Sequence, residues 1–183
     1  MIDLIELGIG GSQAKYIAYK PQKDEWEYND GEPTMDAFLL DPNSLKVGWG
    51  KITRGAPPEY KWRENITIPE TAPGETGTDG WNVAMSLEIY LKDEGMFAWT
   101  TTAKGPIQGM HAIYSQVMAL ASSNEGKIPC LKYTGSEETS WKSRIPQFEV
   151  LKWADKPADW NEAPAQEEAP EPEAEESNED IPF

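Results

Sequence analysis

Aromatic side chains stand beside cationic ones in three short stretches of the sequence. KVGWGKITR (residues 46–54), EYKWRE (59–64) and SWKSR (140–144) each combine tryptophan or tyrosine with lysine and arginine. Flat rings stack on unpaired bases while cations follow the phosphates, so this combination is typical of surfaces that bind single-stranded nucleic acid. With one further ring at Trp99, the candidate DNA-binding residues are Lys46, Trp49, Lys51, Arg54, Tyr60, Lys61, Trp62, Arg63, Trp99, Trp141, Lys142 and Arg144.

Core packing is the competing interpretation of these rings. The chain has eight tryptophans, and most tryptophans in a small β domain are largely buried. Flanking cations favour a surface position for Trp49, Trp62 and Trp141. The net charge of −7 over residues 1–160 argues against a strongly basic groove, so we expect a modest and steeply salt-dependent affinity.

Residues that would support an enzyme or a metal centre are few. His111, the only histidine, falls inside a predicted helix beside its apolar stripe, and Cys130 is the only cysteine. One of each cannot form a Cys/His zinc cluster. The GIGG stretch at residues 8–11 lacks the third glycine of a dinucleotide fingerprint and the GK[ST] ending of a phosphate loop. We therefore expect no catalytic residues, no metal and no cofactor.

The elements that must position the candidate residues are mostly strands. Residues 82–92 alternate apolar and polar side chains, which predicts a half-buried strand, and residues 96–103 supply the second strand of a hairpin. Apolar residues at helical spacing predict one helix that begins near Pro106 and ends near Ala121. Further strands are expected at residues 14–20, 36–40, 46–53, 126–135 and 143–153.

Strands followed by one helix and more strands is the order of a small Greek-key barrel of the OB type. We therefore predict a mainly β fold, an OB-fold-like β-barrel with one α-helix. A β-sandwich or another α+β domain would give a similar pattern.

The charge distribution divides the chain into a body and a tail. Residues 161–183 carry nine acidic residues and no base, together with alanine, proline and glutamine, so they predict a disordered acidic tail. We assign residues 1–156 to the DNA-binding domain and residues 157–183 to the tail. No apolar run approaches the roughly 18 residues that cross a bilayer. The single cysteine and the lack of a leader-like N-terminus favour the cytoplasm.

The end of the tail is the most specific motif in the sequence. Acidic residues and then Ile-Pro-Phe close the chain, at Glu179, Asp180, Ile181, Pro182 and Phe183. This tip resembles the C-terminal tail of bacterial single-stranded DNA-binding proteins (SSB), although Ser177 and Asn178 interrupt the acidic run. The stretches GWGKITRGAPPEY and RIPQFEVLKWADKP are in addition similar to a family of small phage and prophage proteins, over about residues 46–160.

The resemblance implies a phage-encoded, divergent SSB that coats single-stranded DNA in replication, recombination or repair. In that family the tip recruits partner proteins, here host or phage replication and repair proteins. Three alternatives stay open: an adaptor or decoy that uses the tip without binding DNA, a solubilising acidic tail, and a nucleic-acid enzyme. We also expect a homo-oligomer of a size that the sequence does not give, and mild competition between the acidic tail and DNA for the basic groove.

Overall fold

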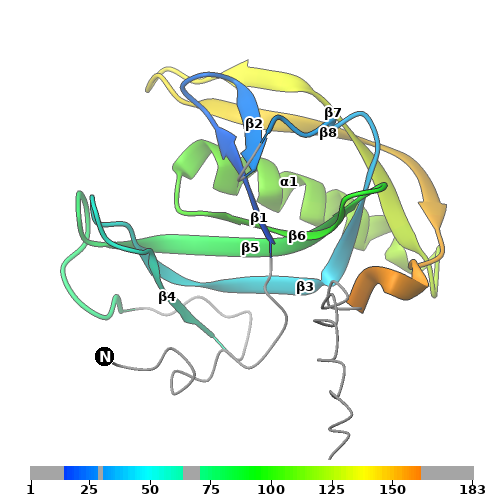
Figure 1. Cartoon of the computed structure of the whole chain (residues 1–183), viewed down its shortest axis with the longest axis horizontal. Coiled ribbons are helices and arrows are strands. Elements are labelled where there is room, and N and C mark those ends of the chain that lie inside the picture. Colours follow the sequence, from blue (N-terminus) through cyan, green and yellow to red (C-terminus); the bar gives the residue numbers. More distant parts are fainter. Residues whose placement is uncertain (1–14, 29–30, 64–70, 162–183) are drawn as a thin grey trace, which may run out of the picture.

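The computed structural model describes residues 15–28, 31–63 and 71–161 of the chain (Figure 1). These residues form one sheet of eight strands, one α helix and a short 3-10 helix. The elements are β1 (Lys15–Lys20), β2 (Glu25–Tyr28), β3 (Phe38–Lys51), β4 (Glu59–Trp62), β5 (Trp81–Leu91), β6 (Gly95–Thr101), α1 (Lys104–Ala121), β7 (Ile128–Glu138), β8 (Arg144–Ala154) and η2 (Ala158–Asn161). The predicted acidic tail lies outside the described residues from residue 162 onward.

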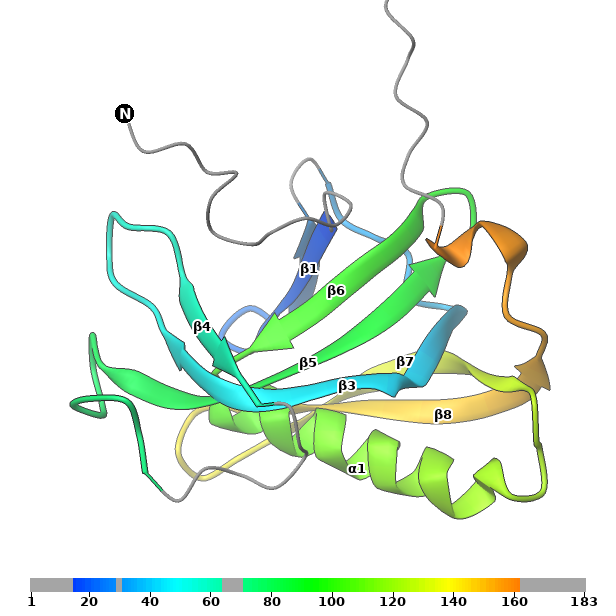
Figure 2. The ribbon, with the colours of Figure 1, turned by 90° about the horizontal axis from the view of Figure 1, so that it is seen from below.

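The sheet curls into a half-barrel with OB-like connections. Its strand order is β2-β1-β6-β5-β3-β7-β8, and β4 pairs with β3 beside this path. The antiparallel pairs β3–β5, β5–β6, β3–β7 and β7–β8, with α1 between β6 and β7, follow the strand order of an OB barrel. In Figure 2 the sheet bends over α1, which packs mainly against β8. The predicted fold class is confirmed.

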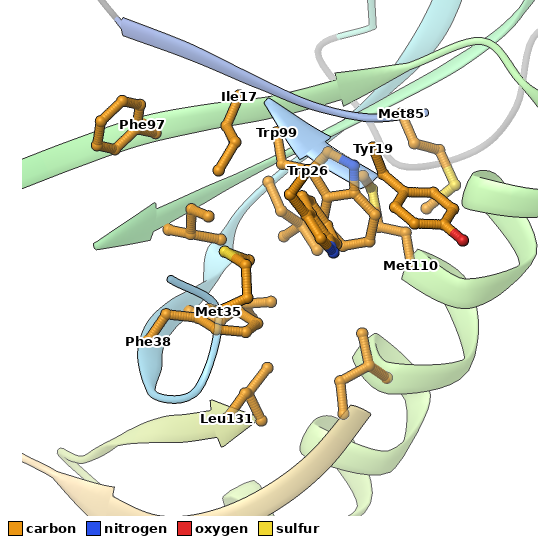
Figure 3. Packing of buried hydrophobic residues seen from close by; sticks show 14 of the residues in the cluster. Ile17, Tyr19, Trp26, Met35, Phe38, Met85, Phe97, Trp99, Met110 and Leu131 are labelled. Atoms are coloured by element: carbon orange, nitrogen blue, oxygen red, sulfur yellow. The ribbon is translucent and has the colours of Figure 1, made fainter. Parts of the chain in front are cut away.

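The core lies between the inner face of the sheet and α1 (Figure 3). In β5 the apolar residues Met85, Leu87, Ile89 and Leu91 are buried as predicted, but Ala84 and Ser86 on the opposite face are buried as well. Helix α1 contributes Met110, Ile113 and Val117 to the same cluster, and all three side chains are almost fully buried. The opposite, outer face of β5 and β6 is consequently left for other contacts.

The chain before β5 departs from the expected strands. The predicted strands at residues 36–40 and 46–53 join into the single long strand β3, whose pairing with β5 breaks between Asp41 and Lys46. At this break the backbone N–H of Asn43 donates to Asp41 Oδ1 at 2.9 Å, and Ser44 Oγ donates to the Asp41 carbonyl at 2.6 Å. These local bonds replace ladder bonds and let the strand bend. Strands β2 and β4 were not predicted.

The C-terminal boundary of the packed residues also differs from the expectation. The domain was assigned to residues 1–156, but Trp160 in η2 is 1% exposed. Lys156 forms an ion pair with Asp41 of β3 at 2.7 Å. The segment from Lys156 to Trp160 is therefore part of the folded body. No helix in the described part of the chain is long and apolar enough to cross a membrane.

Candidate nucleic-acid interface

Two glycines of β3 let β4 fold back tightly over the outer face. Gly48 pairs with Trp62, and Gly50 pairs with Tyr60. A Cβ atom on Gly48 would lie 2.1 Å from the Lys61 carbonyl oxygen, and one on Gly50 would lie 2.9 Å from the Tyr60 ring. Because no side chain intervenes, the rings of Tyr60 and Trp62 lie on the sheet and stack on each other, with centroids 5.1 Å apart and planes 9° apart.

A hollow of about 90 Å³ opens beside this stacked pair. Its walls come from five strands, and its lining residues are Tyr16, Ser44, Lys46, Tyr60, Trp62, Ser86, Glu88, Met96, Ala98 and Thr100. Lys46 is exposed at the outer face, and Tyr16 is 57% exposed. The volume is large enough for several water molecules. The fold therefore brings Lys46, Tyr60 and Trp62 together in one site.

The floor of the hollow is polar. Ser86 of β5 and Thr100 of β6 share a hydrogen bond of 2.8 Å between their hydroxyl oxygens. Burial, and to a smaller extent the neighbouring Tyr16, raises the pKa of Tyr60 above its ordinary value. Tyr60 is thus a neutral ring at physiological pH, and it adds no negative charge to a surface that would face phosphates.

Residues 48–51 of β3, β4 and the turn between them form an antiparallel arm, which we call the β3–β4 arm. Strand alternation places other candidate residues on the opposite side of this arm. Trp49 and Lys61 are direct partners, and Lys61 Nζ lies 5.1 Å from the ring centre of Trp81. Lys51 pairs with Trp81 on the same side. These residues do not share a surface with Tyr60 and Trp62, although they are adjacent in sequence. Arg54 in the exposed turn after β3 and Arg63 after β4 are both solvent-exposed.

The third cluster lies at the turn between β7 and β8. Trp141 is 47% exposed, and Lys104 Nζ lies 4.6 Å from its ring centre. Lys142 is exposed and has a left-handed backbone with φ of 58°. Arg144 is partly committed within the protein, because its guanidinium donates to Ser136 Oγ at 3.2 Å and lies 3.9 Å from a Glu138 carboxylate oxygen.

The connection between β6 and α1 lies between the Tyr60–Trp62 pair and Trp141. A Cβ atom on Gly50, beside the Tyr60 ring, would also lie 2.7 Å from the Thr102 methyl group. Two residues later, Lys104 contacts Trp141. The β3–β4 arm and the β7–β8 turn accordingly lie at the same end of the molecule, on the left in Figures 1 and 2.

Trp99 does not belong to this surface. Its side chain is 1% exposed and packs in the core against Trp26 (Figure 3). It also contacts the Phe148 ring. The sequence predicted Trp99 as a DNA-binding residue, but Phe97 and Trp99 lie on the same face of β6 and both are buried. The alternation of residues in MFAWTTTA (residues 96–103) already indicates that Phe97 and Trp99 share one face of the strand.

Sequence reasoning missed the residues that other strands add to the hollow. Tyr16 comes from β1, Ser86 and Glu88 from β5, and Thr100 from β6. The polar face of residues 82–92 was recognised, but nothing local indicated that β1 and β4 would lie beside it.

Helix η2 packs against the same outer face. The Trp160 ring stacks on Tyr90 of β5, with centroids 5.4 Å and planes 20° apart, and its Nε1 donates to Glu88 Oε2 at 3.3 Å. Tyr90 donates its hydroxyl hydrogen to Asp159 at 2.7 Å. The last described residues are therefore fixed on the outer face of the sheet, next to Glu88 of the hollow.

Comparison with known proteins gives no relative of this chain: no family model, curated protein or solved structure matches it. In the described part of the chain, no group of three or more His, Cys, Asp or Glu side chains is arranged to hold a metal ion. The tip residues Glu179, Asp180, Ile181, Pro182 and Phe183 lie outside the described residues.

Proposed function

We propose that this protein binds single-stranded DNA without marked sequence preference and without catalysing a reaction. The observation that carries the proposal is the place of the exposed and partly exposed rings in an OB-like sheet. OB folds bind oligonucleotides on the face of their second and third strands and on the loops after strands one and four. Counted from β3, these positions are β5, β6, the β3–β4 arm with Tyr60 and Trp62, and the β7–β8 turn with Trp141.

The charges near these rings support contacts to phosphates. Lys46 lines the hollow, and Lys104 and Lys142 flank Trp141. Arg54 is exposed in the turn of the β3–β4 arm, and Arg63 is exposed directly after β4. The body as a whole carries −7, so attraction to DNA is local and its range is about one Debye length. We therefore expect binding that weakens steeply with salt.

The acidic tip adds a second role. Phe183 and Ile181 offer two apolar contacts to a partner pocket, Pro182 restricts the backbone, and the preceding acids suit a basic rim. A protein that coats single strands in the cytoplasm and presents this tip would recruit replication, recombination or repair proteins. Many tips along one strand would compensate for a weak single contact.

A fluorescence titration tests the DNA-binding role. Stacking on exposed tryptophans should quench emission when oligo(dT) is added, with an affinity that falls at least tenfold between about 50 mM and about 200 mM salt. The Lys46→Ala variant should bind more weakly and show a smaller salt dependence. Lys132→Ala, an exposed lysine of β7 that does not line the hollow, is the matched control and should behave as the unmodified protein. Unchanged fluorescence and no retention of the oligonucleotide would contradict DNA binding and favour an adaptor or decoy.

A further inference from the structure

Two carboxylates face each other on the proposed DNA-binding face. Asp41 of β3 and Glu88 of β5 are direct cross-strand partners, so both side chains lie on the same face of the sheet. Asp41 is buried and paired, because Lys156 Nζ lies 2.7 Å from its Oδ2. Glu88 has no ion-pair partner among the described residues, and its side chain lines the same hollow as Tyr60 and Trp62.

The neighbours of Glu88 fix its position and leave it able to accept further hydrogen bonds. Its backbone N–H donates to Ser44 Oγ at 2.8 Å, and Trp160 Nε1 donates to its Oε2 at 3.3 Å. Trp160 is itself held, because it is fully buried against Tyr90. A carboxylate has two oxygens and about four acceptor positions, and the indole N–H uses one of them.

A free carboxylate on this face is unfavourable for a polyanion unless the ligand offers it a donor. Phosphates offer none, but bases do. Cytosine carries an exocyclic amino group at N4 from which glutamate accepts in known base recognition, and adenine carries one at N6. Thymine presents a carbonyl oxygen at the corresponding position, and that oxygen would be repelled by Glu88.

We propose that the hollow is a subsite for one unpaired base with an exocyclic amino group, and that Glu88 is the residue that selects it. The base lies against the Tyr60–Trp62 pair, and its amino group donates to Glu88. Trp160 acts as a positioning residue that holds the carboxylate. This inference rests on the proposed DNA binding and adds a base preference to it.

The experiment compares oligo(dC) and oligo(dT) of one length with the full chain at neutral pH. The expected result is roughly fivefold tighter binding of oligo(dC), since one hydrogen bond to a base edge contributes at the lower end of the range for base discrimination. In Glu88→Gln the ratio should fall to about one, because an amide can donate to thymine as well as accept from cytosine. Glu149→Gln removes an exposed acid of β8 that does not line the hollow, so it controls for the loss of charge and should keep the ratio.

A second variant separates positioning from folding. Trp160→Phe keeps a ring on Tyr90 but removes the N–H that holds Glu88, so we expect a smaller oligo(dC) preference and, because Trp160 is buried, a lower melting temperature that still leaves the variant folded at about 25 °C. Equal binding of both oligonucleotides by the unmodified protein, or a preference that persists in Glu88→Gln, would overturn the role of Glu88 while DNA binding stands. Failure to bind either oligonucleotide would instead overturn the proposed function.

Discussion

Trp62 and Trp99 are the same residue type in one sheet, and they lie in opposite environments. Trp62 is partly exposed on the outer face and stacks on Tyr60, whereas Trp99 is 1% exposed in the core. The difference follows from strand alternation, because neighbouring positions of a strand point to opposite faces of the sheet. Only the outer position leaves the ring partly exposed.

Truncation of these two rings should therefore have different consequences. Trp62→Ala should weaken oligo(dT) binding by about 1–3 kcal/mol, the usual contribution of one base–aromatic stack, and should hardly change the unfolding midpoint. Trp99→Ala should lower the free energy of unfolding by about 3–5 kcal/mol, because it leaves a cavity in the core. Urea unfolding and a fluorescence titration on each variant check this. A Trp62→Ala variant that binds normally would exclude the β3–β4 arm from the interface.

At the scale of elements, Asp24 ties the β1–β2 hairpin to β7. Its Oδ1 accepts hydrogen bonds from Tyr19 at 2.7 Å and from Tyr133 at 2.6 Å. Burial alone would raise the pKa of Asp24, but these hydrogen bonds and the nearby Arg144 lower it below its ordinary value. The charged form is therefore the one that stabilises the folded sheet.

These interactions of the Asp24 carboxylate predict that the free energy of unfolding depends on pH. A lowered folded-state pKa means that the stabilisation is present above the unfolded value of about 4 and is lost as the pH falls through the folded value. Asp24→Asn should lower the free energy of unfolding by about 1 kcal/mol at about pH 7 and by clearly less at about pH 3. Asparagine suits the left-handed backbone at this position, where φ is 58°, so the variant tests the charge alone. An equal loss at both pH values would show that the charge of Asp24 does not stabilise the sheet.

The elements that local patterns describe were predictable from the sequence. Alternation in residues 82–92 and helical spacing up to Ala121 correspond to β5 and α1, because both patterns depend on near neighbours. Strand β4 is only four residues long, and it pairs with β3 because Gly48 and Gly50 leave room for it. No local pattern in the sequence indicates this pairing. Its short length explains why EYKWRE was interpreted as a binding cluster and not as a strand.

The candidate site was predictable only in part, because some of its residues are brought together by pairing between strands that are distant in the sequence. Lys46, Tyr60 and Trp62 were found from their types, and the structure brings them together. Glu88 joins them only through the pairing of β3 with β5, and the position of Trp160 depends on contacts with a strand 70 residues earlier in the chain. A tryptophan followed by acid and proline suggested a linker, because sequence alone does not show the Tyr90 ring that it covers.

At the scale of the whole molecule, the charge of the chain is divided between the body and the acidic tail. The 32 acidic and 16 basic residues give −16, of which residues 161–183 contribute −9 and residues 1–160 contribute −7. Trp160 fixes the start of the acidic segment on the outer face of β5, beside Glu88 of the hollow. The described chain therefore ends next to the surface that we propose for DNA, and we expect the nine acids that follow in the sequence to compete with phosphates for the same lysines and arginines.

Two truncations should separate the roles of the tail. A chain that ends at Asn161 keeps Trp160 but loses all nine acids, so it should bind oligo(dT) several-fold more tightly at about 20 mM salt and about equally at about 300 mM, where screening weakens both attractions. Deletion of Phe183 alone leaves the charge unchanged, so it should not alter DNA affinity, but it should abolish capture of replication and repair proteins from a bacterial lysate. Parallel titrations at both salt concentrations and pull-downs with each chain measure the two effects. An unchanged or weaker affinity in the shorter chain would contradict the competition, and loss of DNA binding on deletion of Phe183 would contradict the separation of the two roles.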